Sequence, residues 1–184
     1  MIPDERQALS LHEKYGSNEQ IVEHCKTVAR ISVVLSDAFA ARGKAVDKKA
    51  VLAGALLHDN GRTRTHEVGH GHVGASMLEK EGVDATVVEI VRRHVGAGIS
   101  PEEAVALGFP KGDYIPRTPE QMLVCFSDKM VSSDSVRPFE EEVKRFVRKG
   151  HDVNRLLALK KSLQDELGGD PEELVLDAFR VSSH

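Results

Sequence analysis

The stretch LLHDNGRTRTHEVGHGH, from Leu56 to His72, decides how this chain is interpreted. It holds four of the nine histidines in the sequence, together with Asp59. His58 and Asp59 directly follow an apolar run, which is an unusual way to finish a helix. The question is what this pair does and which residues elsewhere are its partners.

The apolar run before the pair predicts a buried helix. Asp47 caps it, Val51 and Leu52 belong to its apolar face, and Asn60-Gly61 ends it. An ionised aspartate at a helix C-terminus meets the negative end of the helix dipole. Helix stability therefore does not explain why an aspartate occupies position 59. A bound cation would offset its unfavourable interaction with the helix dipole.

Working outward from this stretch, apolar residues recur at helical spacing along nearly the whole chain. The N-terminal residues are polar and helical in pattern, and no convincing alternating strand, repeat or low-complexity linker appears. The sequence predicts an all-α fold, with helices over 17–43, 47–59, 70–82, 87–94, 118–128, 136–150 and 152–167, one opened by a capping box at 100–103, and one capped by Asp170.

Two segments, Ser17–Gln20 and Ser100–Glu103, have the capping-box pattern, in which a hydroxyl and a Gln or Glu side chain satisfy free backbone N–H groups reciprocally. Thr118–Gln121 opens a further helix. Residues 108–117 contain prolines and glycines and predict a loop. Because this loop lies between His94 and Asp128, it is either an ordinary connection or the rim or lid of a pocket.

Composition narrows the class of protein. The chain has 184 residues, so one domain is expected, and its formal net charge of −4 disfavours binding of long nucleic acids. Two cysteines, Cys25 and Cys125, are too few for a disulfide framework, and we expect both to be buried. Neither a signal-peptide core nor a membrane-length apolar run is present, which favours a cytoplasmic protein without a membrane partner.

Further residues with metal-binding side chains lie in apolar contexts. His24 and Asp128 are near the start and the end of predicted helices, His70 opens one, and His94 ends another. Such ends converge on one cleft in helical bundles, where metal sites are commonly built. Imidazole and carboxylate ligands without thiolate suit Mn, Fe, Co, Ni or Zn, with Mg as a further candidate.

The order of these residues resembles the H…HD…D pattern of the HD-domain metal-dependent phosphohydrolase superfamily. The sequence LLHDNGR is similar to the LLHDIGK of its HDIG-type members, and HGHVGASML, VRRH and FSDKM resemble three later segments of that family. The match runs from His24 to Val131. Asn60 and Arg62 depart from the usual Ile and Lys, at positions that hold no metal.

The resemblance implies a single HD domain over residues 1–184, with core motifs over 24–131 and helices over 136–181 that complete the bundle or form a homodimer face. It implies a metal site at converging helix ends, with these ligands: His24, His58, Asp59, His70, His94 and Asp128. Asp59 would be shared by two metals, although one metal is an alternative. His70 is preferred to His72 because the family's histidine stands four residues before the Gly of its GA pair, here Gly74.

The predicted activity is hydrolysis of a phosphoester or phosphoanhydride bond in a small molecule, which we expect to be a nucleotide. Metals about 3.5–4 Å apart would activate water and bind phosphate oxygens. Asp59 and Arg62 are the candidate catalytic residues, and Arg62, Arg64 and Lys129 are candidates for substrate binding. Two alternatives remain, namely a non-catalytic nucleotide-binding or regulatory domain and a di-iron oxygenase on the same ligands.

The remaining histidines have no specific role in this interpretation. We expect each of them to be a surface group or a satisfied polar group. They are His12, His66, His151 and His184. Arg92 and Arg93 are expected to be solvated or ion-paired.

Overall fold

The chain is helical almost throughout residues 1–181, the part that this computed structural model describes. The prediction of an all-α fold is confirmed. The helices are α1 (Glu5–Tyr15), α2 (Glu19–Ala41), α3 (Lys48–Leu57), the 3-10 helix η1 (Asn60–Thr63), α4 (His70–Lys80), α5 (Ala85–Arg93), α6 (Pro101–Ala106), α7 (Pro119–Lys129), α8 (Phe139–Arg148), α9 (Asn154–Leu167) and α10 (Pro171–Val181).

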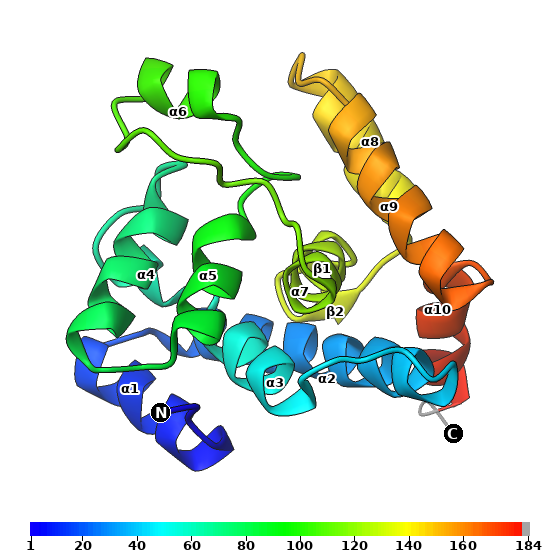
Figure 1. Cartoon of the computed structure of the whole chain (residues 1–184), viewed down its shortest axis with the longest axis horizontal. Helices are drawn as coiled ribbons and strands as arrows, with labels where there is room; N and C mark the ends of the chain where they lie inside the picture. Colours follow the sequence, from blue (N-terminus) through cyan, green and yellow to red (C-terminus); the bar gives the residue numbers. More distant parts are fainter. Residues whose placement is uncertain (182–184) are drawn as a thin grey trace.

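Helices α2, α3 and α7 form the centre of the bundle. Figure 1 shows the long helix α2 along the base with α3 against it, and α7 seen end-on above them. Helices α4 and α5 lie on one side of α7, while α8, α9 and α10 lie on the other. The ends of α2, α3, α4, α5 and α7 therefore meet near the middle of the molecule, where His58 is fully buried.

The core is aliphatic, as the lack of Trp and the scarcity of aromatic residues require. Helix α3 is buried on nearly all sides, and Gly54 allows α5 to approach it closely. A Cβ at Gly54 would lie 2.6 Å from Cγ2 of Ile90. Phe126 and Phe139 stack with their ring centroids 4.9 Å apart and join α7 to α8.

Most predicted helix starts are observed. Asp47 caps α3, and Ser100 forms the predicted capping box of α6. Thr118 opens α7 as predicted, and the structure shows that it does so through a capping box. Asp170 accepts a bond from the backbone N–H of Glu172 at the start of α10. Over residues 1–181, none of the helices combines the length and apolar character that crossing a membrane requires.

The predicted capping box at Ser17 is wrong. The capping residue of α2 is Asn18, whose Oδ1 accepts from the N–H of Ile21. Ser17 instead bonds through Oγ to Nδ1 of His12 at 2.7 Å. Because His12 also reaches the carbonyl oxygen of Leu56 with Nε2 at 2.6 Å, Ser17 belongs to a buried link between α1 and the end of α3.

A small hairpin is found where the sequence predicted that the helix over 136–150 begins. Strands β1 (Val131–Ser132) and β2 (Ser135–Val136) pair antiparallel, with Ser133 in the left-handed region at a φ of 57°. Helix α8 then begins only after Pro138. The absence of strands was therefore predicted incorrectly at this one place, because two-residue strands are too short to show alternation.

Candidate metal centre

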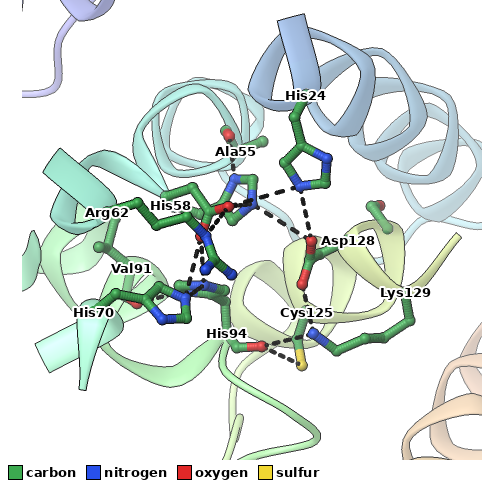
Figure 2. A network of polar contacts seen from close by, with 12 residues as sticks. His24, Ala55, His58, Arg62, His70, Val91, His94, Cys125, Asp128 and Lys129 are labelled. Atoms are coloured by element: carbon green, nitrogen blue, oxygen red, sulfur yellow. Dashed lines mark hydrogen bonds and ion pairs between the residues drawn. The ribbon is translucent and has the colours of Figure 1, made fainter. Parts of the chain in front are cut away.

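Four histidines and two aspartates, which we call the His/Asp cluster, converge where the helix ends meet. His24 lies near the start of α2, His58 caps the C-terminus of α3, His70 opens α4 and His94 follows α5. Asp59 follows His58, and Asp128 is in the last turn of α7. Figure 2 shows the labelled histidines and Asp128 pointing toward one another.

Every histidine of the cluster is fixed in the same way, through Nδ1 to a backbone carbonyl oxygen. His24 reaches the carbonyl of Ser133 at 2.7 Å, and His58 that of Ala55 at 2.8 Å. His70 reaches Glu67 at 2.8 Å, and His94 reaches Val91 at 2.7 Å. A carbonyl oxygen only accepts, so each Nδ1 carries a proton and donates it.

This anchoring leaves the four Nε2 atoms free to act inside the cluster. In a neutral imidazole whose Nδ1 is protonated, Nε2 bears the lone pair that binds a metal, and such outer hydrogen bonds orient metal-bound histidines. Within residues 1–181, Nε2 of His58 and Oδ1 of Asp59 are buried without a hydrogen-bond partner. Buried polar atoms are normally satisfied, so these two atoms point to a missing partner.

Asp59 lies between two groups of ligand atoms and presents one oxygen to each. Its Oδ1 is 3.2 Å from Nε2 of His70 and 3.4 Å from Nε2 of His94. Its Oδ2 is 3.9 Å from Nε2 of His24 and 3.8 Å from Nε2 of His58. This arrangement is suited to a carboxylate that bridges two cations.

Asp128 completes the first of the two groups. Its Oδ1 lies 3.0 Å from Nε2 of His24 and 3.5 Å from Nε2 of His58. In the second group, the Nε2 atoms of His70 and His94 are 3.0 Å apart. Two imidazole lone pairs at this separation repel each other unless a cation or a proton lies between them. The donor set therefore fits one or two metal ions, in agreement with the predicted cofactor class.

The electrostatics of the cluster keep both carboxylates charged. Burial raises the pKa of Asp59, but the charge of His58 and the nearby imidazoles of His70 and His94 bring it well below its usual range. Burial likewise raises the pKa of Asp128, but Lys129, His24 and His58 together bring it well below its usual range. Both side chains are thus available as anionic ligands at neutral pH.

The pKa values of two histidines of the cluster are shifted in opposite directions. Burial lowers the pKa of His94 to about 4, so His94 is neutral and able to bind a cation. Burial also lowers the pKa of His24, but its hydrogen bond to Asp128 raises it above its ordinary value overall. A metal therefore competes with a proton at His24, and metal affinity is expected to fall as the pH drops.

Two glycines explain how His70 reaches the cluster. A Cβ at Gly61 would overlap the carbonyl oxygen of His70 and lie 2.7 Å from the backbone nitrogen of Gly74. A Cβ at Gly74 would collide with Oδ1 of Asn60. The backbone after Asp59 thus packs directly on α4. Asn60 is fully buried there and donates from Nδ2 to the carbonyl of Gly74 at 3.4 Å.

His72, the alternative to His70, points elsewhere. Its Nδ1 lies 3.1 Å from Nη1 of Arg92, and its ring stacks on Phe109 with the centroids 6.1 Å apart. Phe109 belongs to the loop over 108–117, which therefore covers the start of α4. Arg92 and Arg93 are ion-paired with Glu89, as expected.

The predicted substrate-binding residues lie at different distances from the cluster. Nε of Arg62 donates to Oδ2 of Asp59 at 2.6 Å, and Figure 2 shows its guanidinium within the network of the cluster. Arg64 is exposed, and its side chain bonds only weakly to the carbonyl of Thr63 at 3.5 Å. Lys129 is buried, with Nζ 2.5 Å from Oδ2 of Asp128 and 3.2 Å from the carbonyl oxygen of His94.

Sequence reasoning missed two supports of the cluster. The hairpin supplies the carbonyl of Ser133 that anchors His24, and Thr27 bonds to the carbonyl of Asp134 at 3.0 Å beside it. The pattern VSSDSV, two valines around a run of turn-forming residues, was the available signal. Lys129 was the second support, and its place at the end of an apolar helix was the signal for burial. Cys25 and Cys125 are both buried, as predicted, and Sγ of Cys125 lies 3.4 Å from the carbonyl of His94.

Comparison with known families agrees with this geometry. The profile of the HD domain matches residues 21–132, which is more than half of the chain and contains the whole His/Asp cluster. The chain belongs to the HD-domain family. The family resemblance found in the sequence is thereby confirmed.

Three curated relatives of this HD-domain chain come from archaea. Proteins named tRNA (cytidine(56)-2'-O)-methyltransferase from Thermoplasma volcanium and Picrophilus torridus are 39% and 36% identical over 95% and 96% of the chain. The chain spans only 51% of the length of each of these two proteins. The uncharacterized protein MJ0778 of Methanocaldococcus jannaschii is 37% identical over 87% of the chain and 96% of its own length.

Solved structures share the fold at low identity. The HD domain of the L. monocytogenes phosphodiesterase PgpH superposes with a TM-score of 0.62 and 16% identity, over 95% of this chain and 99% of that one. The same domain in complex with cyclic-di-AMP gives a TM-score of 0.56 and 16% identity, over 86% and 93% of the two chains. These likenesses confirm the HD-type helical bundle.

Proposed function

We propose that this HD domain is a metal-dependent phosphohydrolase that cleaves a phosphoester or phosphoanhydride bond of a small molecule, most simply a nucleotide. The observation that carries the proposal is the pair of ligand groups that share Asp59, with four Nε2 atoms directed inward by backbone anchors. His24, His58, Asp59 and Asp128 would hold one metal, and Asp59, His70 and His94 a second.

When bound, such metals supply Lewis acidity and a water activated near neutral pH. The chain's own residues orient the reactants. Arg62 donates through Nε to Asp59, which leaves its two terminal amino groups to hold phosphate oxygens. Lys129 fixes Asp128 and the backbone of His94 at once, so that one ligand from each group is held in place.

The proposal assigns hydrolysis, and not methyl transfer, to this part of the chain. The methyltransferase name belongs to relatives of about twice the matched length. Four imidazoles and two carboxylates at a shared centre are ligands that suit a hydrolytic metal site. Support for a phosphorylated substrate comes from the name of the structural neighbour, a phosphodiesterase whose HD domain was solved with cyclic-di-AMP.

The test is turnover by the purified chain on a panel of nucleoside monophosphates, dinucleotides, cyclic nucleotides and a small aryl phosphate. Each substrate is assayed with Mn, Fe, Co, Ni, Zn or Mg, and again with a chelator. We expect phosphate or nucleotide release with at least one transition metal and loss of it with the chelator. Absence of hydrolysis in a fully metal-loaded protein would overturn the proposal and leave a binding or regulatory domain or a di-iron oxygenase.

Arg62 provides a prediction specific to phosphate binding. Arg62→Ala is expected to raise KM by roughly tenfold to a hundredfold, because a charge-assisted hydrogen bond contributes about 1.5–3 kcal/mol. Arg62→Lys should recover only part of this loss, since an ammonium group lacks the guanidinium fork. Steady-state kinetics with parallel metal analysis measures both effects. Wild-type kinetics in Arg62→Ala would exclude the phosphate contact, and reduced metal content would show that Arg62 acts through Asp59 instead.

A further inference from the structure

A cavity of about 700 Å³ lies between α8 and the β1–β2 hairpin, outside the His/Asp cluster. Its apolar part is formed by Val131 of the hairpin, Pro138, Val143 and Val147. Val147 is 61% exposed, which is high for a large apolar side chain on a helix that packs on a core. The volume is within the range of sites that bind small molecules, about 300–1,000 Å³.

The polar part of the cavity is strongly cationic. Arg137, Lys144, Arg145 and Arg148 line it together with Lys129. Glu141 and Glu142 also line the cavity, so its lining holds more cationic than anionic side chains in a chain whose formal net charge is −4. The local field therefore has the opposite sign to the protein as a whole and favours an anionic ligand.

Four of the five cations are already ion-paired, Lys129 with Asp128 and the other three with glutamates. Arg145 pairs with Glu142 at 2.5 Å, Arg137 with Glu141 at 3.3 Å, and Lys144 with Glu140 at 2.9 Å. Arg148 makes no ion pair within the part of the chain that the structure describes, residues 1–181. It is exposed at the end of α8 and free to bind an anion.

The cavity shares a wall with the metal centre. Lys129 lines the cavity and also binds Asp128, a member of the His/Asp cluster. The pKa of Arg145 is raised, mainly by its hydrogen bond to Glu142 and in smaller part by the charge of Asp128. The electrostatic field of the cluster thus reaches α8, and a ligand in the cavity lies next to the Asp128 side of the centre.

We propose that the cavity over α8 and the hairpin binds the non-reacting part of a nucleotide substrate, with a phosphate on Arg148 and the base against Val143 and Val147. This inference rests on the proposed hydrolysis at the His/Asp cluster and names where the rest of the substrate lies. A cationic rim beside an apolar floor matches a nucleotide, which joins an anionic phosphate to a flat apolar base.

The test is titration of metal-free protein with ADP, in the presence of a chelator, by calorimetry. The chelator removes metal-mediated phosphate binding at the cluster, and Arg62→Ala in the same titration removes the phosphate contact proposed for Arg62, so the remaining binding reports on the cavity. Arg148→Glu is expected to raise the Kd for ADP about tenfold or more, which corresponds to about 1.4 kcal/mol. Lys149→Glu is the matched control, because Lys149 is the exposed neighbour, carries the same charge and does not line the cavity.

A second comparison distinguishes the binding of the base from the binding of the phosphate. Val147→Asn should weaken binding of ADP and leave binding of inorganic pyrophosphate unchanged. Equal ADP affinity in the Arg148→Glu and Lys149→Glu variants would overturn the inference, as would absence of ADP binding to the metal-free wild type. Hydrolysis of a small aryl phosphate needs the metal centre alone, so its persistence in Arg148→Glu keeps the two proposals distinguishable.

Discussion

Asp59→Ala is expected to bind no metal at either position and to lose hydrolysis by more than about a thousandfold. Both ligand groups depend on this carboxylate, because its two oxygens face different pairs of histidines at 3.2–3.9 Å. Removing the metals removes several kcal/mol of transition-state stabilisation, and about 1.4 kcal/mol corresponds to each factor of ten. Elemental analysis and turnover measured on the same preparation test both parts of this expectation.

Variants of single histidines distinguish the two groups of metal ligands. His24→Ala should empty the position shared with Asp128, and His94→Ala the position shared with His70, so each is expected to retain about one metal where the wild type has about two. Asp37→Ala changes an exposed carboxylate on α2 and should retain the full load. A full metal load in Asp59→Ala would refute the shared-carboxylate assignment, and circular dichroism shows whether the variant is folded.

The sequence predicted the centre of this molecule better than its periphery. Apolar periodicity identified α3 and α5, and the position of His58 and His94 at the ends of those helices followed from it. The spacing of His70 to Gly74 favoured His70 over His72 as a ligand, and the structure places His70 within the cluster. These features depend on local pattern, which a single sequence contains.

Features that depend on tertiary contacts were not predictable in the same way. Ser17 and Asn18 are both good capping residues, and only the buried His12, which uses Ser17, decides between them. The anchors of the histidines are backbone carbonyls, which leave no signature in the side-chain sequence. The cavity beside α8 is formed where the hairpin and α8 meet, a tertiary arrangement that the sequence pattern did not predict.

Lys129 is the clearest case of a role that only the structure reveals. Its substitution is the second change for which we expect a large effect. The sequence left open whether Lys129 contributes charge or faces solvent. Its side chain is 6% exposed and holds the 16% exposed Asp128. Burial lowers the pKa of Lys129, but Asp128 raises it above its ordinary value overall, so the lysine is charged. Breaking a buried ion pair by removing one partner costs about 3–5 kcal/mol, because the other charge remains buried and uncompensated.

Lys129→Met, which retains most of the side-chain volume, is therefore expected to lower the free energy of unfolding of the metal-free protein by about 3–5 kcal/mol at pH 7. The pKa of Asp128 is depressed in the fold, so its stabilisation is present above its unfolded pKa of about 3.9 and is lost as the pH falls through the folded value. The wild type and the variant should therefore converge in acid. Urea unfolding at pH 7 and under acid conditions, with a chelator present, measures the difference.

The stability gained on metal binding shows whether Lys129 acts through its charge or through packing. A cation bound to Asp128 replaces the missing positive charge, so saturating Mn should restore more stability to Lys129→Met than it adds to the wild type. Lys26→Met is the control, because Lys26 is 39% exposed and its ion pair with Glu23 is screened by solvent, which limits the expected loss to less than about 1 kcal/mol. If Lys129→Met unfolds at the same urea concentration as the wild type at pH 7, Lys129 does not hold Asp128. If metal stabilises both proteins equally, the lysine contributes volume and not charge to the centre.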